Sequence, residues 1–147
     1  IGVDPARLVG KVLTRIRRSP VHPSVTLDFA DHTTFQVRVD GYDPAHRGVP
    51  KELETNAALH ALVPGAAPRD VRLTVTHARL VGVRDTAHDL RAASAGRWIV
   101  EHLALALRFA EPEADGWHCV WATMAEYDGR FGPCLFRSFD DVYLDEI

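Results

Sequence analysis

The chain is poor in several residue types that polar binding sites commonly use. Its 147 residues include one asparagine (Asn56), one glutamine (Gln36) and only two lysines (Lys11 and Lys51), beside 15 arginines. Side-chain amides are the usual bidentate readers of adenine, and they serve many other polar pockets. A carbohydrate-binding or adenine-reading site would therefore have to work almost without them. A GC-rich genome produces the same bias toward arginine and alanine, so this composition does not by itself identify a site.

Cysteines and long apolar runs are also scarce. Cys119 and Cys134 are the only cysteines, too few for a disulfide framework. No apolar run approaches the roughly 20 residues of a membrane-spanning helix. The chain begins without the charged and apolar segments of a signal peptide, so an intracellular location is expected. Apolar residues make up 46% and charged residues 25%, which indicates one globular domain over residues 1–147.

Charge is distributed unevenly along the chain. The net charge is −3, which predicts no general affinity for nucleic acid or an anionic membrane. Residues 1–110 hold 15 basic and 11 acidic side chains, whereas residues 111–147 hold 2 basic and 9 acidic ones. This acidic C-terminal segment is either a surface for a protein partner or a solvated face packed on its own domain.

Hydrophobic periodicity indicates both strands and helices. Alternation predicts strands at residues 8–17, 24–29, 34–39, 71–83 and 117–125, with final strand material at 134–139 and 142–144. A first helix is predicted from Pro50 to about Leu62, because proline is favoured at the first helical position. A second is predicted from about residue 94 to 110, where His102 and Leu103 lie on an apolar stripe.

The order of these elements, β-β-β-α-β-α-β-β, predicts a mostly antiparallel α+β domain. Its first five elements match the opening order of an OB-type barrel, which would be partly closed and carry a helical insertion. Within the strand at 71–83, the apolar alternation changes phase near His77. A phase change of this kind indicates a bulge or a bend.

The 8 histidines raise the question of metal binding. No His-x-His pair and no helical His/Glu pair at i, i+3 or i+4 is present, so no metal is expected. No glycine-rich phosphate cradle occurs either, and no cofactor is expected. In the long loop at residues 40–50, Asp43 and His46 are three residues apart and could share a ligand with the adjacent Arg47.

Two histidines are candidates for acid–base chemistry, because histidine both accepts and donates protons near neutral pH. His102 lies on the apolar stripe of the predicted second helix, and His77 lies at the strand phase change. The alternative for His102 is a core histidine with a hydrogen-bond partner. Either residue could also line the wall of a pocket.

Two tryptophans are the remaining signal. Trp117 and Trp121 share one face of the predicted strand at 117–125. That face either belongs to the core or offers two indole rings to an apolar or planar ligand. In the second case, His102 and His77 could supply polar anchors.

Three functions follow from these observations. The leading hypothesis is a non-catalytic binding module for a ligand or a protein partner, since no motif has catalytic spacing. The second is a small acid–base enzyme (an isomerase, cyclase or hydrolase) that uses a pocket histidine. The third is an OB-like binder of single-stranded nucleic acid, which needs arginines and aromatic rings on one face. Alternation opposes this third hypothesis, because it sends Arg38 and Phe35 to opposite faces.

Overall fold

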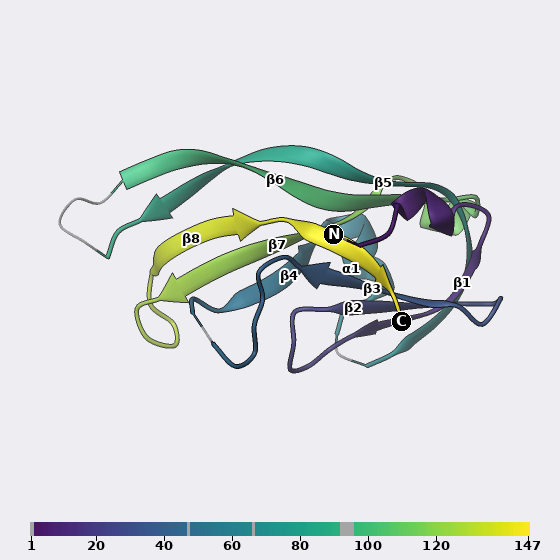
Figure 1. Ribbon diagram of the computed structural model, residues 1–147, viewed down its shortest axis with the longest axis horizontal. Helices are drawn as coiled ribbons and strands as arrows, with labels where there is room; N and C mark the ends of the chain where they lie inside the picture. Colours follow the sequence, from purple (N-terminus) through teal and green to yellow (C-terminus); the bar gives the residue numbers. More distant parts are fainter. Residues whose placement is uncertain (1, 47, 66, 92–95) are drawn as a thin grey trace.

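The computed structural model describes residues 2–46, 48–65, 67–91 and 96–147 (Figure 1). Within these residues the elements are, in order, η1 (Pro5–Leu8), β1 (Val12–Arg18), β2 (Val25–Phe29), β3 (Thr34–Val39), β4 (Lys51–Thr55), α1 (Ala57–Leu62), β5 (Arg69–Asp89), β6 (Gly96–Phe109), η2 (Pro112–Ala114), β7 (His118–Tyr127), β8 (Cys134–Asp140) and β9 (Val142–Glu146). The two η elements are single 3₁₀ turns. None of the helices described here is long and apolar enough to cross a membrane.

The strands form one antiparallel sheet, as the alternating segments predict. Its order is β4-β7-β6-β5-β1-β2-β3-β9, and β8 lies off this path and pairs with both β5 and β7. A long hairpin of β5 and β6 extends beyond the other strands (Figure 1). Only Asp141 separates β8 from β9, so the chain passes directly from the β7 side of the sheet to β3.

The sheet encloses one hydrophobic core. Alternation sends Phe35, Val37 and Val39 of β3 inward, and Val142 and Leu144 of β9 join them. The same buried cluster contains residues from the opposite end of the strand order, in β4 and β7. The two halves of the sheet therefore pack on each other, and the polar side chains of β1, β2, β3 and β9 point outward.

The predicted helix at 94–110 is wrong for its described part, because residues 96–109 form the strand β6; residues 94 and 95 lie outside the described residues. The strand β6 pairs with β5 continuously from Gly96 to Phe109. From Leu103 to Phe109, larger apolar residues recur at every second position, which is the period of a strand. Leu103, Ala106 and Ala110 also fit a helical stripe. Pairing with a long partner strand decides between the two periods.

The predicted helix at 50–62 is only partly correct. Its first half is the strand β4, in which Leu53 pairs with Ala122 of β7. Asn56 then begins α1, because its side-chain oxygen accepts a hydrogen bond from the Leu59 amide at 3.2 Å. The fold is thus a mostly antiparallel sheet with little helix. The bulge predicted near His77 is confirmed by a register shift between Val75 and His77.

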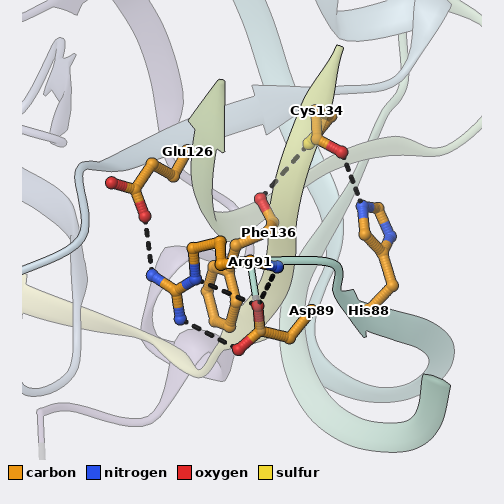
Figure 2. Close-up of polar contacts among 6 residues, drawn as sticks. All are labelled: His88, Asp89, Arg91, Glu126, Cys134 and Phe136. Carbon is orange, nitrogen blue, oxygen red and sulfur yellow. Dashed lines mark hydrogen bonds and ion pairs between the residues drawn. The ribbon is translucent and has the colours of Figure 1, made fainter. Parts of the chain in front are cut away.

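Arg91 connects the tip of the β5–β6 hairpin to two other strands (Figure 2). Its guanidinium donates two hydrogen bonds of 3.0 Å to the carboxylate of Asp89 and one of 2.6 Å to Glu126 of β7. The guanidinium carbon also lies 4.4 Å from the ring centroid of Phe136 in β8. Because Arg91 donates to the carboxylate, the pKa of Asp89 is held below its ordinary value.

A second contact fixes the same end of β5. His88 donates from Nε2 to the carbonyl of Cys134 in β8 at 3.2 Å (Figure 2). His88 and Asp89 also pair with Arg137 and Phe136 of β8. These contacts anchor β5 at its far end and leave β6 as the outer strand of the hairpin there.

Candidate functional site

The outward face of β1, β2, β3 and β9 carries a continuous row of polar side chains. Arg17 pairs with Thr26, Thr26 with Gln36, and Arg38 with Tyr143 across neighbouring strands. Strand alternation places these side chains opposite the buried apolar residues of the same strands. The chain's single glutamine therefore lies in the middle of this face.

Two arginines on this face are held in fixed orientations. Arg17 donates to the carboxylate of Asp28 from Nε at 2.9 Å and from Nη2 at 3.1 Å. Arg38 donates from Nε to Gln36 at 2.9 Å and from Nη1 to Asp145 at 3.0 Å. Among the described residues, these contacts leave Nη1 of Arg17 and Nη2 of Arg38 as available donors.

A third arginine, Arg18, is the last residue of β1. Arg18 donates from Nη1 to the carbonyl of Leu53 at 2.8 Å and from Nη2 to the hydroxyl of Thr55 at 3.5 Å. Both acceptors are neutral, so these contacts do not neutralise its positive charge. Gln36 is itself oriented, because its amide donates to the hydroxyl of Thr26 at 3.0 Å.

A turn and one tyrosine form the rim. The hydroxyl of Ser19 accepts from the amides of Val21 and His22 at 3.2 and 3.1 Å. The ring of His22 packs edge-on against Tyr42, with Nδ1 at 2.9 Å from the tyrosine hydroxyl.

Together these parts enclose a cleft of about 700 Å³, which we call the arginine cleft. The arginine cleft is lined by arginines, by two tyrosines and by proline rings, namely Arg17, Arg18, Ser19, Pro20, His22, Pro23, Ser24, Thr26, Gln36, Arg38, Val39, Tyr42, Pro44, Pro68 and Tyr143. Among the described residues that line it, none is an aspartate or a glutamate.

A second cleft of about 470 Å³ also has Tyr42 in its lining and contains two predicted ligand-binding residues. Oδ2 of Asp43 lies 2.9 Å from Nδ1 of His46, as their spacing in the sequence suggested. The amide of Ala45 and the His46 ring lower the pKa of the Asp43 carboxyl. Arg47, the third residue of this prediction, lies outside the described residues.

His102 is a buried residue with one firm partner. Its Nε2 donates to Oδ2 of Asp85 at 2.6 Å, and its ring stacks on Phe139 with centroids 4.8 Å apart. The side chain is 1% exposed, and Nδ1 is buried without a partner among the described residues. This is the geometry of a core histidine. His102 still borders a shallow cleft of about 370 Å³ that includes Lys51 and Asp140.

His77 and the two tryptophans lie elsewhere. His77 is exposed at the bulge of β5, and its ring packs edge-on against Trp117 at 5.8 Å. Trp117 is 39% exposed and has the guanidinium of Arg108 over its ring, whereas Trp121 is half-buried. The structure therefore brings His77 and Trp117 together but leaves His102 apart from them. Neither tryptophan lines the two clefts beside Tyr42.

The acidic C-terminal segment packs against basic residues from the rest of the chain. Four of its carboxylates form ion pairs with residues from the first 91 positions: Glu126 with Arg91, Asp140 with Lys51, Asp145 with Arg38 and Glu146 with Arg7. The charge asymmetry of the sequence is thus largely matched within the fold.

The remaining metal and thiol candidates offer little chemistry. Within the described ranges, no group of three or more His, Cys, Asp and Glu side chains could hold a metal ion. Cys119 and Cys134 are free and partly buried, and burial raises the pKa of the Cys119 thiol. A raised pKa keeps the thiol protonated and weakly nucleophilic.

Comparison of the chain with protein-family models, curated proteins and solved structures gave no match. Sequence reasoning placed Arg38 on the face opposite Phe35 but did not find the arginine cleft itself. Tyr143 and Gln36 were missed because their cross-strand neighbours, Arg38 of β3 and Thr26 of β2, lie beside them only through the strand order. The alternation Val142-Tyr143-Leu144 was the available signal, since it leaves one aromatic ring outward.

Proposed function

We propose that this protein is a non-catalytic binding module that holds a small organic anion in the arginine cleft. One observation carries the proposal. A chain of net charge −3 has gathered Arg17, Arg18 and Arg38 around one cleft whose described lining has no carboxylate side chain. Asp28 and Asp145 balance two of these charges from outside the lining, so Arg18 supplies the net positive charge that attracts an anion, and the oriented donors of Arg17 and Arg38 bind it.

The lining supports a ligand with both a charged and a planar part. Nη1 of Arg17 and Nη2 of Arg38 are donors suited to a carboxylate or phosphate group. The rings of Tyr42 and Tyr143, with the neighbouring prolines, offer apolar surface to a ring or a short chain. A volume of about 700 Å³ suits a small molecule of this kind.

The arginines are ordered before a ligand arrives. Asp28 holds Arg17, and both Gln36 and Asp145 hold Arg38. A guanidinium already fixed by such contacts loses little rotamer entropy on binding, which favours affinity. Arg18 keeps the local charge positive because its acceptors are neutral oxygens.

Titration calorimetry with phenyl phosphate tests this proposal, with benzyl alcohol and benzylamine as uncharged and cationic ring controls. We expect phenyl phosphate to bind with a Kd of about 1 mM or tighter, and the two controls not to bind. Arg17→Gln and Arg38→Gln should each weaken binding about tenfold, because each removes a charge-assisted donor. Arg15→Gln removes the same charge outside the arginine cleft and should change the Kd less than about twofold. Equal binding of all three ring compounds would contradict the proposal.

Single-stranded nucleic acid is a second candidate, because Arg38 and Tyr143 are cross-strand neighbours on an open sheet face. Arginines beside aromatic rings are the usual platform for unpaired bases. The OB-like comparison, which rested on element order, belongs to this candidate. Oligothymidylate binding measured from about 50 to about 500 mM salt would distinguish it, since phosphate contacts weaken steeply with salt. No binding at low salt would exclude it.

A further inference from the structure

The strand β6 has an open edge. It pairs with β5 along its whole length but with β7 only from Leu105 to Leu107. Among the residues that the structure describes, no strand pairs with the other edge of β6 between Gly96 and Leu103. Along this stretch β6 lies beside β8: the ring of Trp98 is 6.4 Å from that of Phe136, and the ring of His102 stacks on Phe139.

The direction of the open backbone groups follows from Leu103. Its amide donates to Oδ1 of Asp141 at 2.7 Å and so points away from β5. Backbone groups alternate direction along a strand, and no register shift separates Leu103 from residue 97. The amides and carbonyls of Arg97, Ile99 and Glu101 therefore point outward, toward any added strand.

The side chains along this edge are exposed, and several are apolar. Ile99 is 55% exposed and Trp98 is 42% exposed. The segment contains no proline and no bulge, two devices that protect free edges from pairing. An edge with these features is a template for another strand.

The sequence of the edge is complementary to itself. Around Ile99, the segment Arg97-Trp98-Ile99-Val100-Glu101 has opposite charges at equal distances on either side. In an antiparallel pair centred on Ile99, Arg97 faces Glu101 of the partner subunit and Trp98 faces Val100 of the partner subunit. Opposite charges and aromatic–β-branched pairs both stabilise neighbouring strands.

We propose that β6 is a dimerisation strand, which pairs antiparallel with β6 of a second copy about a twofold axis at Ile99. The outward groups of Arg97, Ile99 and Glu101 then supply about six backbone hydrogen bonds. Asp141 ends the pairing because it already occupies the Leu103 amide. The contacts of Arg91 at the tip of β5 hold the hairpin in place, so little order is lost on association (Figure 2).

The expected dimer is reversible. A contact one strand wide is small beside the roughly 1,200 to 2,000 Å² of a standard stable interface. We therefore expect half-dissociation at about 100 µM protein. This proposal goes beyond ligand binding in the arginine cleft, which lies on other strands, and either proposal can fail without the other.

Sedimentation velocity from about 10 to about 500 µM protein tests the dimer and its register. Arg97→Glu and Glu101→Arg each place like charges opposite one another twice per dimer, and each should raise the dissociation constant about tenfold or more. The double variant, Arg97→Glu with Glu101→Arg, restores both opposite-charge pairs with the two charges exchanged. Its dimer dissociation constant should return to within about threefold of the wild-type value. Arg79→Glu is the matched control, because it makes the same charge change on β5 away from this edge.

Ile99→Pro is a second variant, which removes the outward amide at the centre of the interface and should abolish dimerisation. Circular dichroism shows whether each variant keeps its strands. A wild-type chain that stays monomeric at every concentration overturns the proposal. It does so even if the β6 edge binds a strand of another protein instead. Single variants that dimerise like the wild type, or a double variant that does not recover, overturn it as well.

Discussion

Single residues determine how the arginine cleft presents its charge. The guanidinium groups of Arg17 and Arg38 each donate hydrogen bonds to a carboxylate, and each keeps another N–H donor available to a ligand. A lysine could not do this, because it lacks the planar fork that bonds two groups in fixed directions. The shortage of lysine and of amides in the sequence is therefore compatible with a polar site built on arginine.

We expect the main role of His102 to be stabilisation of the fold. His102→Ala removes the stack on Phe139 and leaves the carboxylate of Asp85 without its 2.6 Å donor. We expect the free energy of unfolding to fall by about 3 kcal/mol, measured by urea denaturation. His77→Ala is the control, because this exposed side chain should cost less than about 1 kcal/mol. Equal losses for the two variants would contradict a buried structural role for His102.

At the scale of elements, β6 shows where sequence patterns stop being decisive. Leu103, Leu105 and Leu107 fit a strand period, while Leu103, Ala106 and Ala110 fit a helical stripe. Local propensity could not separate these options, because the deciding contacts of Leu103 and Leu107 are with β5, 21 to 29 residues away in the chain. The exposed and buried faces of β3 and β9, by contrast, were predictable because their alternation is clean.

A pair of proline substitutions tests the strand assignment of β6. Val100 lies in an inward position whose amide points to β5, so Val100→Pro should cost about 3 kcal/mol of unfolding free energy. The amide of Ile99 points outward, so Ile99→Pro should cost about 1 kcal/mol. Chemical denaturation at low protein concentration, where the chain is monomeric, measures both. Losses of equal size would indicate a helix, in which either proline is equally disruptive.

At the scale of the whole molecule, the acidic C-terminal segment is part of the fold. Val142 and Leu144 of β9 are each 1% exposed, and β9 covers the edge of β3. The charge asymmetry is visible in the sequence, but the sequence could not show that Asp145 and Glu146 meet arginines more than a hundred residues away. Pairings of such separation depend on the strand order, which no local pattern encodes.

Removal of residues 141–147 should therefore unfold the chain. The deletion removes two fully buried side chains, each contributing about 2 kcal/mol, together with the five-residue pairing with β3. Proton NMR would show a loss of dispersed methyl and amide signals. As a control, Asp145→Asn with Glu146→Gln removes the charges alone and should keep the dispersion, since exposed ion pairs contribute little. A deletion variant that keeps its native spectrum would contradict this account.

The most direct test of anion binding in the arginine cleft is to locate the residues that the anion contacts. Amide and arginine Nε–H signals can be followed by two-dimensional NMR while phenyl phosphate is added. We expect saturable shifts at Arg17, Gln36, Arg38 and Tyr143, with the side-chain signals of the two arginines moving most. Shifts confined to the surface around Trp117 and Trp121, or none at any of these positions, would contradict anion binding in the arginine cleft.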